Sequence, residues 1–474
     1  MSNEKRRLPL SATQLSGFFE CQHLTWRELA VARGEQRRPG QNELERWMLE
    51  YRGHAHEARL LEWYRQQGLE VVELPAVPSG NAEALARAAE ATLAALERGA
   101  DVVYQATLQL GAWTGRPDFL TKVPGRGRWG DFHYEVVDAK LAQHAQARAI
   151  IQLCDYTEQL SVLQGVLPAR FWIAIGGSSA TQELRAPLEL RTLDYLAYYR
   201  QAKARFEAFI TDSDVSEPYP EPVEHCDVCR WWKECETRRR ADDHLALVAG
   251  CTRRQRDRLD GAGIRTMTAL AGIGPEQGVP GIEPAPLVRL REQARLQVAA
   301  RSTGQHSYEL LLEVEPGSGL ERLPLPTPGD LFLDLEGDAY ALGEGIEYLF
   351  GLLELGQPSL DWSRREKPGA PHQLSFWSQN RAQEKRAFEA VMRRIERGRT
   401  EFPALHVFHF GQREVDALKK LSCRHATMED QVDRLLREHV LVDLHAVVRQ
   451  SLRASVEGYT LKQLEALYAF TREL

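Results

Sequence analysis

The chain has 474 residues and a formal net charge of −7, with 43% hydrophobic and 27% charged residues. At roughly 100–200 residues per domain this length predicts two to four domains, and the composition is that of an ordinary folded soluble protein. The negative charge argues against a protein that coats nucleic acid irrespective of sequence. No signal peptide and no run of ~20 apolar residues is present, and seven cysteines do not make a disulfide scaffold. We therefore expect a cytoplasmic protein without a membrane partner.

The first half of the chain reads as helix, meander, helix and strand. Residues 42–66 predict a long amphipathic helix that offers Trp47, Met48, Tyr51, Leu60 and Leu61 to a core. Further elements are expected in an α/β order: a helix over 82–98, strands over 102–110, 114–122 and 133–138, a helix over 147–165 and a strand over 170–175.

A Pro-rich stretch at 217–222 predicts an extended boundary. The helical unit expected over 243–274 contains a Gly-x-Gly-Ile turn, which is either a helix-hairpin-helix or an ordinary connector. After Pro/Gly-rich breaks, a second α/β domain is expected, with strands over 331–336, 346–353 and 404–410 and helices over 381–397, 411–421 and 428–438. The predicted domains are residues 1–240, 241–311 and 328–474.

Two acidic residues and a lysine form the first chemical pattern. Hydrolysis of a phosphodiester needs an activated water and neutralisation of the phosphate, which carboxylates holding Mg²⁺ or Mn²⁺ can provide. Asp118 starts one expected strand, and Asp138 ends the next with Lys140 two residues on. Period-two alternation places Asp138 and Lys140 on one face of the sheet. Taken alone, a D-x-K of this kind is usually a solvated strand edge.

The order of several such motifs carries more information than any one of them. Gly53/His56/Glu57, Gly115/Asp118, Asp138/Lys140 and Gln152/Tyr156 follow one another along the chain, and Gln152 and Tyr156 share one helix face. This series, within residues 10–240, resembles the RecB-type PD-(D/E)XK nucleases. The resemblance implies a restriction-endonuclease-like core in which His56, Asp118 and Asp138 hold the metal. It also implies that Lys140 is catalytic and that Gln152 and Tyr156 contact DNA. Asp138 replaces the commoner Glu, and His54 competes with His56.

Four cysteines flank this core. Cys226, Cys229 and Cys235 form a C-x2-C-x5-C cluster, and Cys21 lies some two hundred residues earlier. The cluster alone could be half a zinc site, but no second C-x2-C pair is present. The arrangement resembles the iron-staple subclass of these nucleases, which includes AddB-like and CRISPR-adaptation nucleases. The resemblance implies one [4Fe–4S] cluster with a structural role.

A second acidic pattern lies in the C-terminal domain. Asp334 and Glu336 share one face of a strand, with Glu414 and Asp443 following. This region resembles the YprB-type RNase H-like domain, in which such residues bind two metals. Glu414 stands where a second Asp motif is usual, and the last acidic helix is not found. The sequence therefore predicts an incomplete domain and a weak second metal site.

The main hypothesis is a Mg²⁺- or Mn²⁺-dependent deoxyribonuclease with an iron–sulfur cluster, acting on single-stranded or end-containing DNA in repair, recombination or end processing. The alternatives are a non-catalytic DNA-binding scaffold of a helicase–nuclease assembly, or a CRISPR-adaptation-type nuclease. Arg253 and Arg254 are candidate DNA contacts, although such charge runs are more often solvated helix faces. The resemblance also implies a superfamily 1 helicase, in a longer parent or a separate partner, because no G-x-x-x-x-G-K-[ST] motif occurs in this chain.

Overall fold

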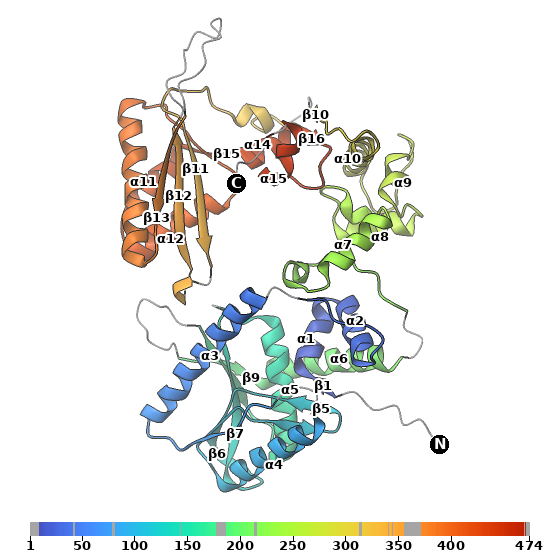
Figure 1. Cartoon of the computed structure of the whole chain (residues 1–474), viewed down its shortest axis with the longest axis vertical. Helices are drawn as coiled ribbons and strands as arrows, with labels where there is room; N and C mark the ends of the chain where they lie inside the picture. The colour runs from blue at the N-terminus through green and yellow to red at the C-terminus, as the bar shows by residue number, and fades with distance from the viewer. Residues whose placement is uncertain are drawn as a thin grey trace, which may run out of the picture. The chain divides into compact units, whose positions relative to one another are not determined.

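The computed structural model describes residues 9–40, 43–77, 81–142, 144–176, 186–212, 216–311, 315–339, 341–343, 345–354, 371–468 and 470. It divides the chain into two compact units, Met1–Cys235 and Glu236–Leu474 (Figure 1). The mixture of helices and mixed sheets confirms the predicted α/β class. Among the described helices, none combines the length and the apolar character needed to cross a membrane.

A six-stranded mixed sheet forms the centre of the N-terminal unit. Its strands, in spatial order, are β2 (Val71–Glu73), β3 (Val102–Tyr104), β6 (Phe119–Gly127), β7 (Gly130–Lys140), β8 (Arg170–Ile175) and β9 (Leu188–Arg191). The β6–β7 hairpin is antiparallel and β7–β8 is parallel, so the carboxyl ends of β7 and β8 lie at the same edge.

Helices cover both faces of this sheet. On one face lies α3 (Glu43–Gln66), whose Leu60, Leu61 and Tyr64 are buried against Phe119 and Val137. The alternate residues of the same strands face a larger core, which is built with the remaining helices. Those helices are α1 (Ala12–Glu20), α2 (Gln22–Ala32), α4 (Ala82–Arg98), α5 (Ala147–Gln164) and α6 (Thr192–Thr211).

Two expectations for this unit were wrong in part. Trp47 and Tyr51 do not enter the core: they are 59% and 63% exposed and stack on each other. The side chain of Met48 lies outside the described residues. The strands expected over 102–110 and 114–122 are each broken, because β4 (Leu108–Leu110) and β5 (Trp113–Gly115) leave the main sheet. They join β1 (Leu10–Ser11) in a small separate sheet.

A helical segment follows at 224–303. It comprises η1 (Glu224–Val228), α7 (Trp232–Ala241), η2 (Leu245–Leu247), α8 (Arg253–Gly261), α9 (Met267–Ala271) and α10 (Pro284–Thr303). The turn between α8 and α9 passes through Gly263 at φ +80°, a left-handed conformation that favours glycine. Thr266 then caps α9 by accepting the N–H of Ala269.

The C-terminal unit is built on a five-stranded sheet with the spatial order β13 (His372–Trp377), β12 (Ile346–Glu354), β11 (Leu331–Asp338), β14 (Val407–His409) and β15 (Leu441–Asp443). The first three strands are antiparallel, and β14 and β15 run parallel to β11. Carboxyl ends of β11, β14 and β15 therefore meet at one edge.

Three helices bury the same face of this sheet, with Leu331, Leu333 and Leu335 of β11 in the shared core. They are α11 (Arg381–Glu401) and α12 (Arg413–His425), both labelled in Figure 1, and α13 (Glu429–Arg437). The remaining described elements of this unit are β10 (Tyr308–Leu310), η3 (Gly319–Arg322), η4 (Ala341–Gly343), α14 (Leu444–Ser451), β16 (Leu452–Ala454), α15 (Leu461–Leu464) and η5 (Glu465–Leu467).

Candidate active sites

The predicted acidic residues of the N-terminal unit lie at neighbouring strands, Asp118 immediately before β6 and Asp138 within β7. Phe119 pairs with Val137 across β6–β7, so one more step of that register sets Asp118 opposite Asp138. The Oδ2 of Asp118 accepts the backbone N–H of Ala139 at 2.8 Å. Lys140 forms an ion pair with Asp138 through its Nζ, as expected for two residues on one face. The structure therefore brings Asp118, Asp138 and Lys140 together.

Burial and mutual repulsion control the charges at this site. Burial raises the pKa of the Asp118 carboxyl well above its usual range, and the neighbouring charge of Asp138 raises it further. Burial alone would lower the pKa of Lys140, but the charges of Asp138 and Asp118 outweigh it and raise the pKa. Two carboxylates in this position lose their repulsion when a cation or a proton stands between them. Such an arrangement is a frequent property of functional sites.

Glu57 is a third carboxylate of this site that the sequence motif contained but to which no role was given. Its Oε2 accepts hydrogen bonds from Tyr104 Oη at 3.1 Å and Gln105 Nε2 at 2.9 Å, and its charge also raises the pKa of Asp118. Gln105 lies at φ +58°, a left-handed conformation that costs a non-glycine residue about 1–3 kcal/mol. In this conformation the side-chain amide of Gln105 lies within hydrogen-bond distance of Glu57.

The structure separates the two candidate histidines. His54 is exposed on α3, whereas His56 is buried and donates from Nε2 to the carbonyl oxygen of Ala174 at 2.9 Å. Because a carbonyl can only accept, the Nδ1 of His56 must be the unprotonated nitrogen. This Nδ1 is buried and has no hydrogen-bond partner, and burial lowers the pKa of the ring. A neutral imidazole with an unused lone pair has the chemistry of a metal ligand.

The Gln–Tyr helix packs directly against the turn before Asp118. A Cβ atom on Gly115 would lie 2.8 Å from Tyr156 Cδ1 and 3.1 Å from Gln159 Nε2, so only glycine allows this approach. Tyr156 is buried, and its pKa is raised by that burial and by the charges of Asp138 and Asp118. Gln152 is half-buried and donates to Thr13 Oγ1 at 3.3 Å.

The cysteine cluster and the N-terminal helices are adjacent. His225 pairs with Glu20 at 2.8 Å, and Trp231 Nε1 donates to Glu28 at 3.0 Å. Burial raises the pKa of the Cys229 thiol, and the neighbouring Cys21 and Cys226 raise it further. Cys21, Cys226 and Cys229 are therefore neighbours, and no disulfide joins the seven cysteines.

Two thiols outside the cluster have a different role. Cys154 is buried in the core of the N-terminal unit, where burial raises the pKa of its thiol to about 12. Cys251 is buried in the core of the helical segment. Both act as small apolar side chains.

The C-terminal site is also assembled at a sheet edge. Asp334 and Glu336 are exposed on β11, and Asp443 ends β15, opposite His409 of β14. Glu414 is buried in the first turn of α12, and one of its carboxylate oxygens, Oε2, has no hydrogen-bond partner. Burial raises the pKa of Glu414 to about 7, and the charges of Asp334 and Asp443 contribute. The four predicted acidic residues therefore surround one edge of the sheet.

The four acidic side chains of the C-terminal site are near one another but do not form a complete set of metal ligands. Over the described ranges, no group of three or more His, Cys, Asp or Glu side chains stands in a geometry that could hold a metal ion. Asp443 in particular already accepts the N–H groups of Gly411, His445 and Ala446 through Oδ1. The site residues have the right chemistry for a hard cation, but binding would require them to close around it.

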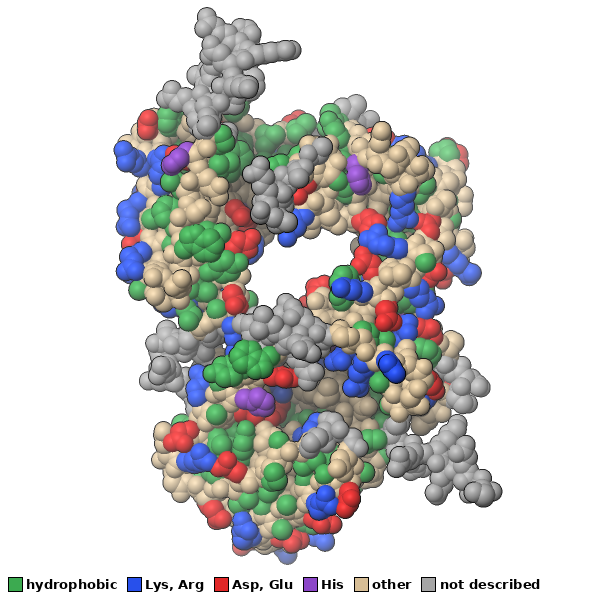
Figure 2. All heavy atoms as spheres, viewed as in Figure 1, with side chains coloured by type: hydrophobic (Ala, Val, Ile, Leu, Met, Phe, Trp, Pro, Cys, Tyr) green, Lys and Arg blue, Asp and Glu red, His purple; other side chains and the backbone are tan. Residues whose placement is uncertain are grey.

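Several basic residues of α7 and α8 have structural roles. Arg240 pairs with Glu236 and Glu457, and buried Arg256 donates to the carbonyl oxygen of Cys251. Arg253 and Arg254 are exposed in the first turn of α8. Cations are unfavourable at a helix N-terminus, so these two arginines are not there to stabilise α8. Acidic and basic side chains are mixed over the face shown in Figure 2.

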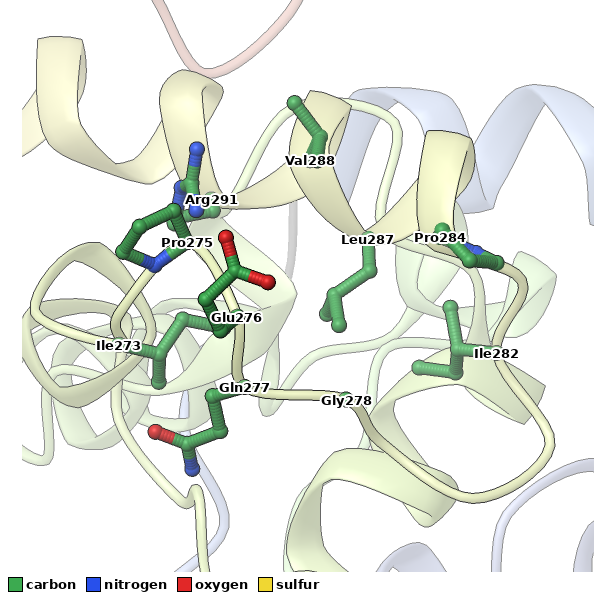
Figure 3. A pocket seen from close by; sticks show the side chains of 10 residues that line it. All are labelled: Ile273, Pro275, Glu276, Gln277, Gly278, Ile282, Pro284, Leu287, Val288 and Arg291. Atoms are coloured by element: carbon green, nitrogen blue, oxygen red, sulfur yellow. The ribbon is translucent and has the colours of Figure 1, made fainter.

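A pocket of about 230 Å³ lies in the helical segment. Its wall is mostly apolar, with Glu276, Gln277 and Arg291 as polar members (Figure 3). None of the predicted site residues lines it, so the pocket has no part in the chemistry of the acidic sites.

Replacing Glu414 by Gln is expected to stabilise the metal-free protein at pH 8. A carboxyl whose pKa is raised from 4.5 to about 7 contributes its stability below pH 4.5 and loses it as the pH rises through 7. At 1.36 kcal/mol per unit the gain is at most about 3 kcal/mol. Urea denaturation of wild type and Glu414→Gln at pH 5 and pH 8 measures it, with exposed Glu401→Gln as the control. A Glu414→Gln protein less stable than wild type at pH 8 would contradict this charge arrangement.

The comparisons with known proteins concern the C-terminal part of the chain. No curated protein and no solved structure matches the sequence. Residues 331–474 match the family model of the RNase_H superfamily, starting at the first residue of β11 and including the whole five-stranded sheet. Domains of this kind are usually metal-dependent hydrolases of nucleic acid. The C-terminal part of this chain is therefore an RNase H-like domain, which indicates nuclease-type activity.

Proposed function

We propose that this protein is a Mg²⁺- or Mn²⁺-dependent nuclease that hydrolyses phosphodiester bonds of DNA at Asp118, Asp138 and Lys140. The observation that carries the proposal is the position of two carboxylates opposite each other, Asp118 immediately before β6 and Asp138 in β7, with Lys140 paired to Asp138. Their mutual repulsion is the reason for expecting a cation between them. The resemblance to RecB-type PD-(D/E)XK nucleases agrees with this assignment.

Each residue of the site has a distinct task in this proposal. Asp118, Asp138 and the Nδ1 of His56 would hold the cation, with Glu57 as a neighbouring carboxylate. A divalent cation there supplies the positive charge that activates water and offsets the charge on the phosphate. Lys140 orients the attacking water or neutralises a phosphate oxygen, since its raised pKa keeps the ammonium charged. Tyr156 and Gln152 position the DNA beside these groups.

We further propose that Cys21, Cys226, Cys229 and Cys235 hold one [4Fe–4S] cluster with a structural role. Cys21 and Cys226 each accept a backbone N–H at 3.4 Å, from Leu24 and Val223, and both raise the pKa of Cys229. Mutual repulsion of thiolates and N–H donors to sulfur are features of iron–sulfur sites. The cluster would tie the first helices to the end of the N-terminal unit.

The setting proposed for this activity is DNA repair, recombination or end processing. The turn between α8 and α9, together with Arg253 and Arg254, would contact phosphates of the DNA. A superfamily 1 helicase, in the same polypeptide or as a partner, would deliver the DNA strand. A non-catalytic scaffold is the competing function, and it predicts no metal-dependent cleavage at all.

Asp334→Ala is expected to change DNA cleavage little. The C-terminal site holds a cation less firmly in this proposal, because Asp443 is engaged by three backbone N–H groups and Glu414 has a pKa near 7. The assay uses labelled single-stranded, double-stranded and circular DNA with Mg²⁺, Mn²⁺ or EDTA.

The same assay distinguishes cleavage by the N-terminal unit from cleavage by the C-terminal unit. Cleavage that survives Asp118→Ala/Asp138→Ala and disappears on adding Asp334→Ala would assign activity to the RNase H-like domain. Total loss of cleavage in Asp334→Ala alone would make the C-terminal site the principal one. An RNA substrate measured in parallel tests whether that domain prefers RNA.

A further inference from the structure

The face of the C-terminal sheet opposite α11, α12 and α13 is accessible where β11, β12 and β13 run side by side. Leu331, Leu333 and Leu335 point into the core, so alternate residues of β11 point to the other face. Those residues include Asp334 and Glu336, which are both exposed. The open face therefore begins at the proposed cation-binding carboxylates.

Strand register extends two rows of side chains from these carboxylates across the sheet. Glu336 pairs with Leu349, which pairs with Trp377. Asp334 pairs with Gly351, which pairs with Ser375. At about 4.8 Å per strand, Trp377 lies roughly 10 Å from Glu336.

Trp377 remains 67% exposed on this face, although its ring already stacks on Tyr348 with 6.4 Å between the ring centroids. An indole in water costs free energy that a flat partner would recover. Gly351 leaves room beside Asp334: a Cβ there would meet only Asp334 atoms at 3.4 and 3.9 Å, an ordinary contact. The surface between the Trp377 ring and the two carboxylates is therefore low at Gly351, which has no side chain.

The strip between the carboxylates and Trp377 carries no charged side chain on β12 or β13. The positions next to the carboxylates on β12 and β13 are uncharged, and they are Leu349, Gly351, Leu353, Gln373, Ser375 and Trp377. At its border Glu347 is paired with Arg413 at 3.0 Å. A polyanion could therefore lie along the strip without meeting a carboxylate until it reaches Asp334 and Glu336.

We infer that this strip binds a single strand of nucleic acid, with one base stacked on Trp377 and the backbone leading to Asp334 and Glu336. The inference rests on the proposed nuclease function and adds a substrate-positioning residue to its second site. Stacking on an aromatic ring requires an unstacked base, which a single strand offers and a duplex does not. It tolerates any base, so no sequence preference is expected.

The test measures binding of fluorescent dT₁₂ and U₁₂ to the full-length chain by anisotropy, with Ca²⁺ in place of Mg²⁺ to slow hydrolysis. Trp377→Ala is expected to weaken binding roughly 5- to 100-fold, the range of one base–aromatic stack. Trp377→Phe should retain most of the affinity. Tyr308→Ala, which removes another exposed ring (57%) on β10, is the matched control and should not change the affinity.

A second measurement locates the contact independently of the N-terminal unit. Oligonucleotides carrying 5-iodouracil are cross-linked by light, and we expect the modified peptide to contain Trp377. Wild-type affinity in Trp377→Ala, or equal losses in its Ala and Phe variants, would overturn the inference, as would cross-links only elsewhere. Failure of the nuclease proposal appears separately, as absence of metal-dependent cleavage while the Trp377 effect persists.

Discussion

Asp138→Ala is expected to lower metal-dependent DNA cleavage by roughly 10²- to 10⁴-fold, because a cation contributes several kcal/mol to the transition state of phosphodiester hydrolysis. The carboxylate of Asp138 faces Asp118 across β6–β7 and is the ion-pair partner of Lys140. Its removal takes away a ligand and the group that orients the lysine. Initial rates with Mg²⁺ and Mn²⁺ on end-labelled DNA measure the loss.

The fold should survive this substitution. Asp138 is buried next to another carboxylate, and its charge raises the pKa of Asp118. Removing one of two repelling groups relieves that strain, a frequent property of residues retained for activity rather than stability. Lys140 remains half-exposed and can reach water.

Controls separate chemistry from stability. Asp131→Ala changes an exposed carboxylate on the same strand and should cleave like wild type. Urea denaturation of Asp138→Ala should show a free energy of unfolding equal to or above that of wild type. Wild-type cleavage rates in Asp138→Ala would place the reaction elsewhere in the chain.

The sequence predicted best those elements whose ends are set by residues close to them in the chain. The helix predicted over 82–98 has those bounds in the structure, where Asn81 caps its start and Gly99, at φ +80°, ends it. The strand expected over 102–110 was wrong because the chain turns at Gln105, whose positive φ no pattern announces. Trp47 and Tyr51 matched a helical stripe, yet among the described side chains of α3 the first buried one is His56, where the helix meets the sheet.

The part of the candidate site that depends on the side-chain alternation within one strand could be predicted from the sequence. Alternation gave the common face of Asp138 and Lys140, but their position opposite Asp118 depends on the β6–β7 register. Glu57 belongs to the site through Tyr104 and Gln105, contacts between distant segments that no spacing encodes. The strip ending at Trp377 was missed for the same reason, since β13 was not predicted and its register appears only in the sheet.

Cys21→Ser is expected to remove the iron and destabilise the N-terminal unit. Four thiolates bind one [4Fe–4S] cluster, so anaerobically purified wild type should be brown with about four irons per chain, and the variant nearly colourless. Cys21 is the one predicted ligand that lies before the nuclease core. Opening a closed loop of some two hundred residues should cost about 5 kcal/mol, the scale of a cross-link over such a loop.

Thermal unfolding and metal analysis of the full-length chain test this prediction. A loss of that size lowers the melting temperature by about 10 °C or more in a unit of about 235 residues. Cys423→Ser, which changes an exposed thiol of α12, is the matched control and should leave iron and melting temperature unchanged. The folded fraction of Cys21→Ser should retain cleavage, because the thiol is not among the groups that interact with Asp118 and Asp138. One stoichiometric zinc in colourless wild type, or iron that persists in Cys21→Ser, would show that these four thiols do not hold an iron–sulfur cluster.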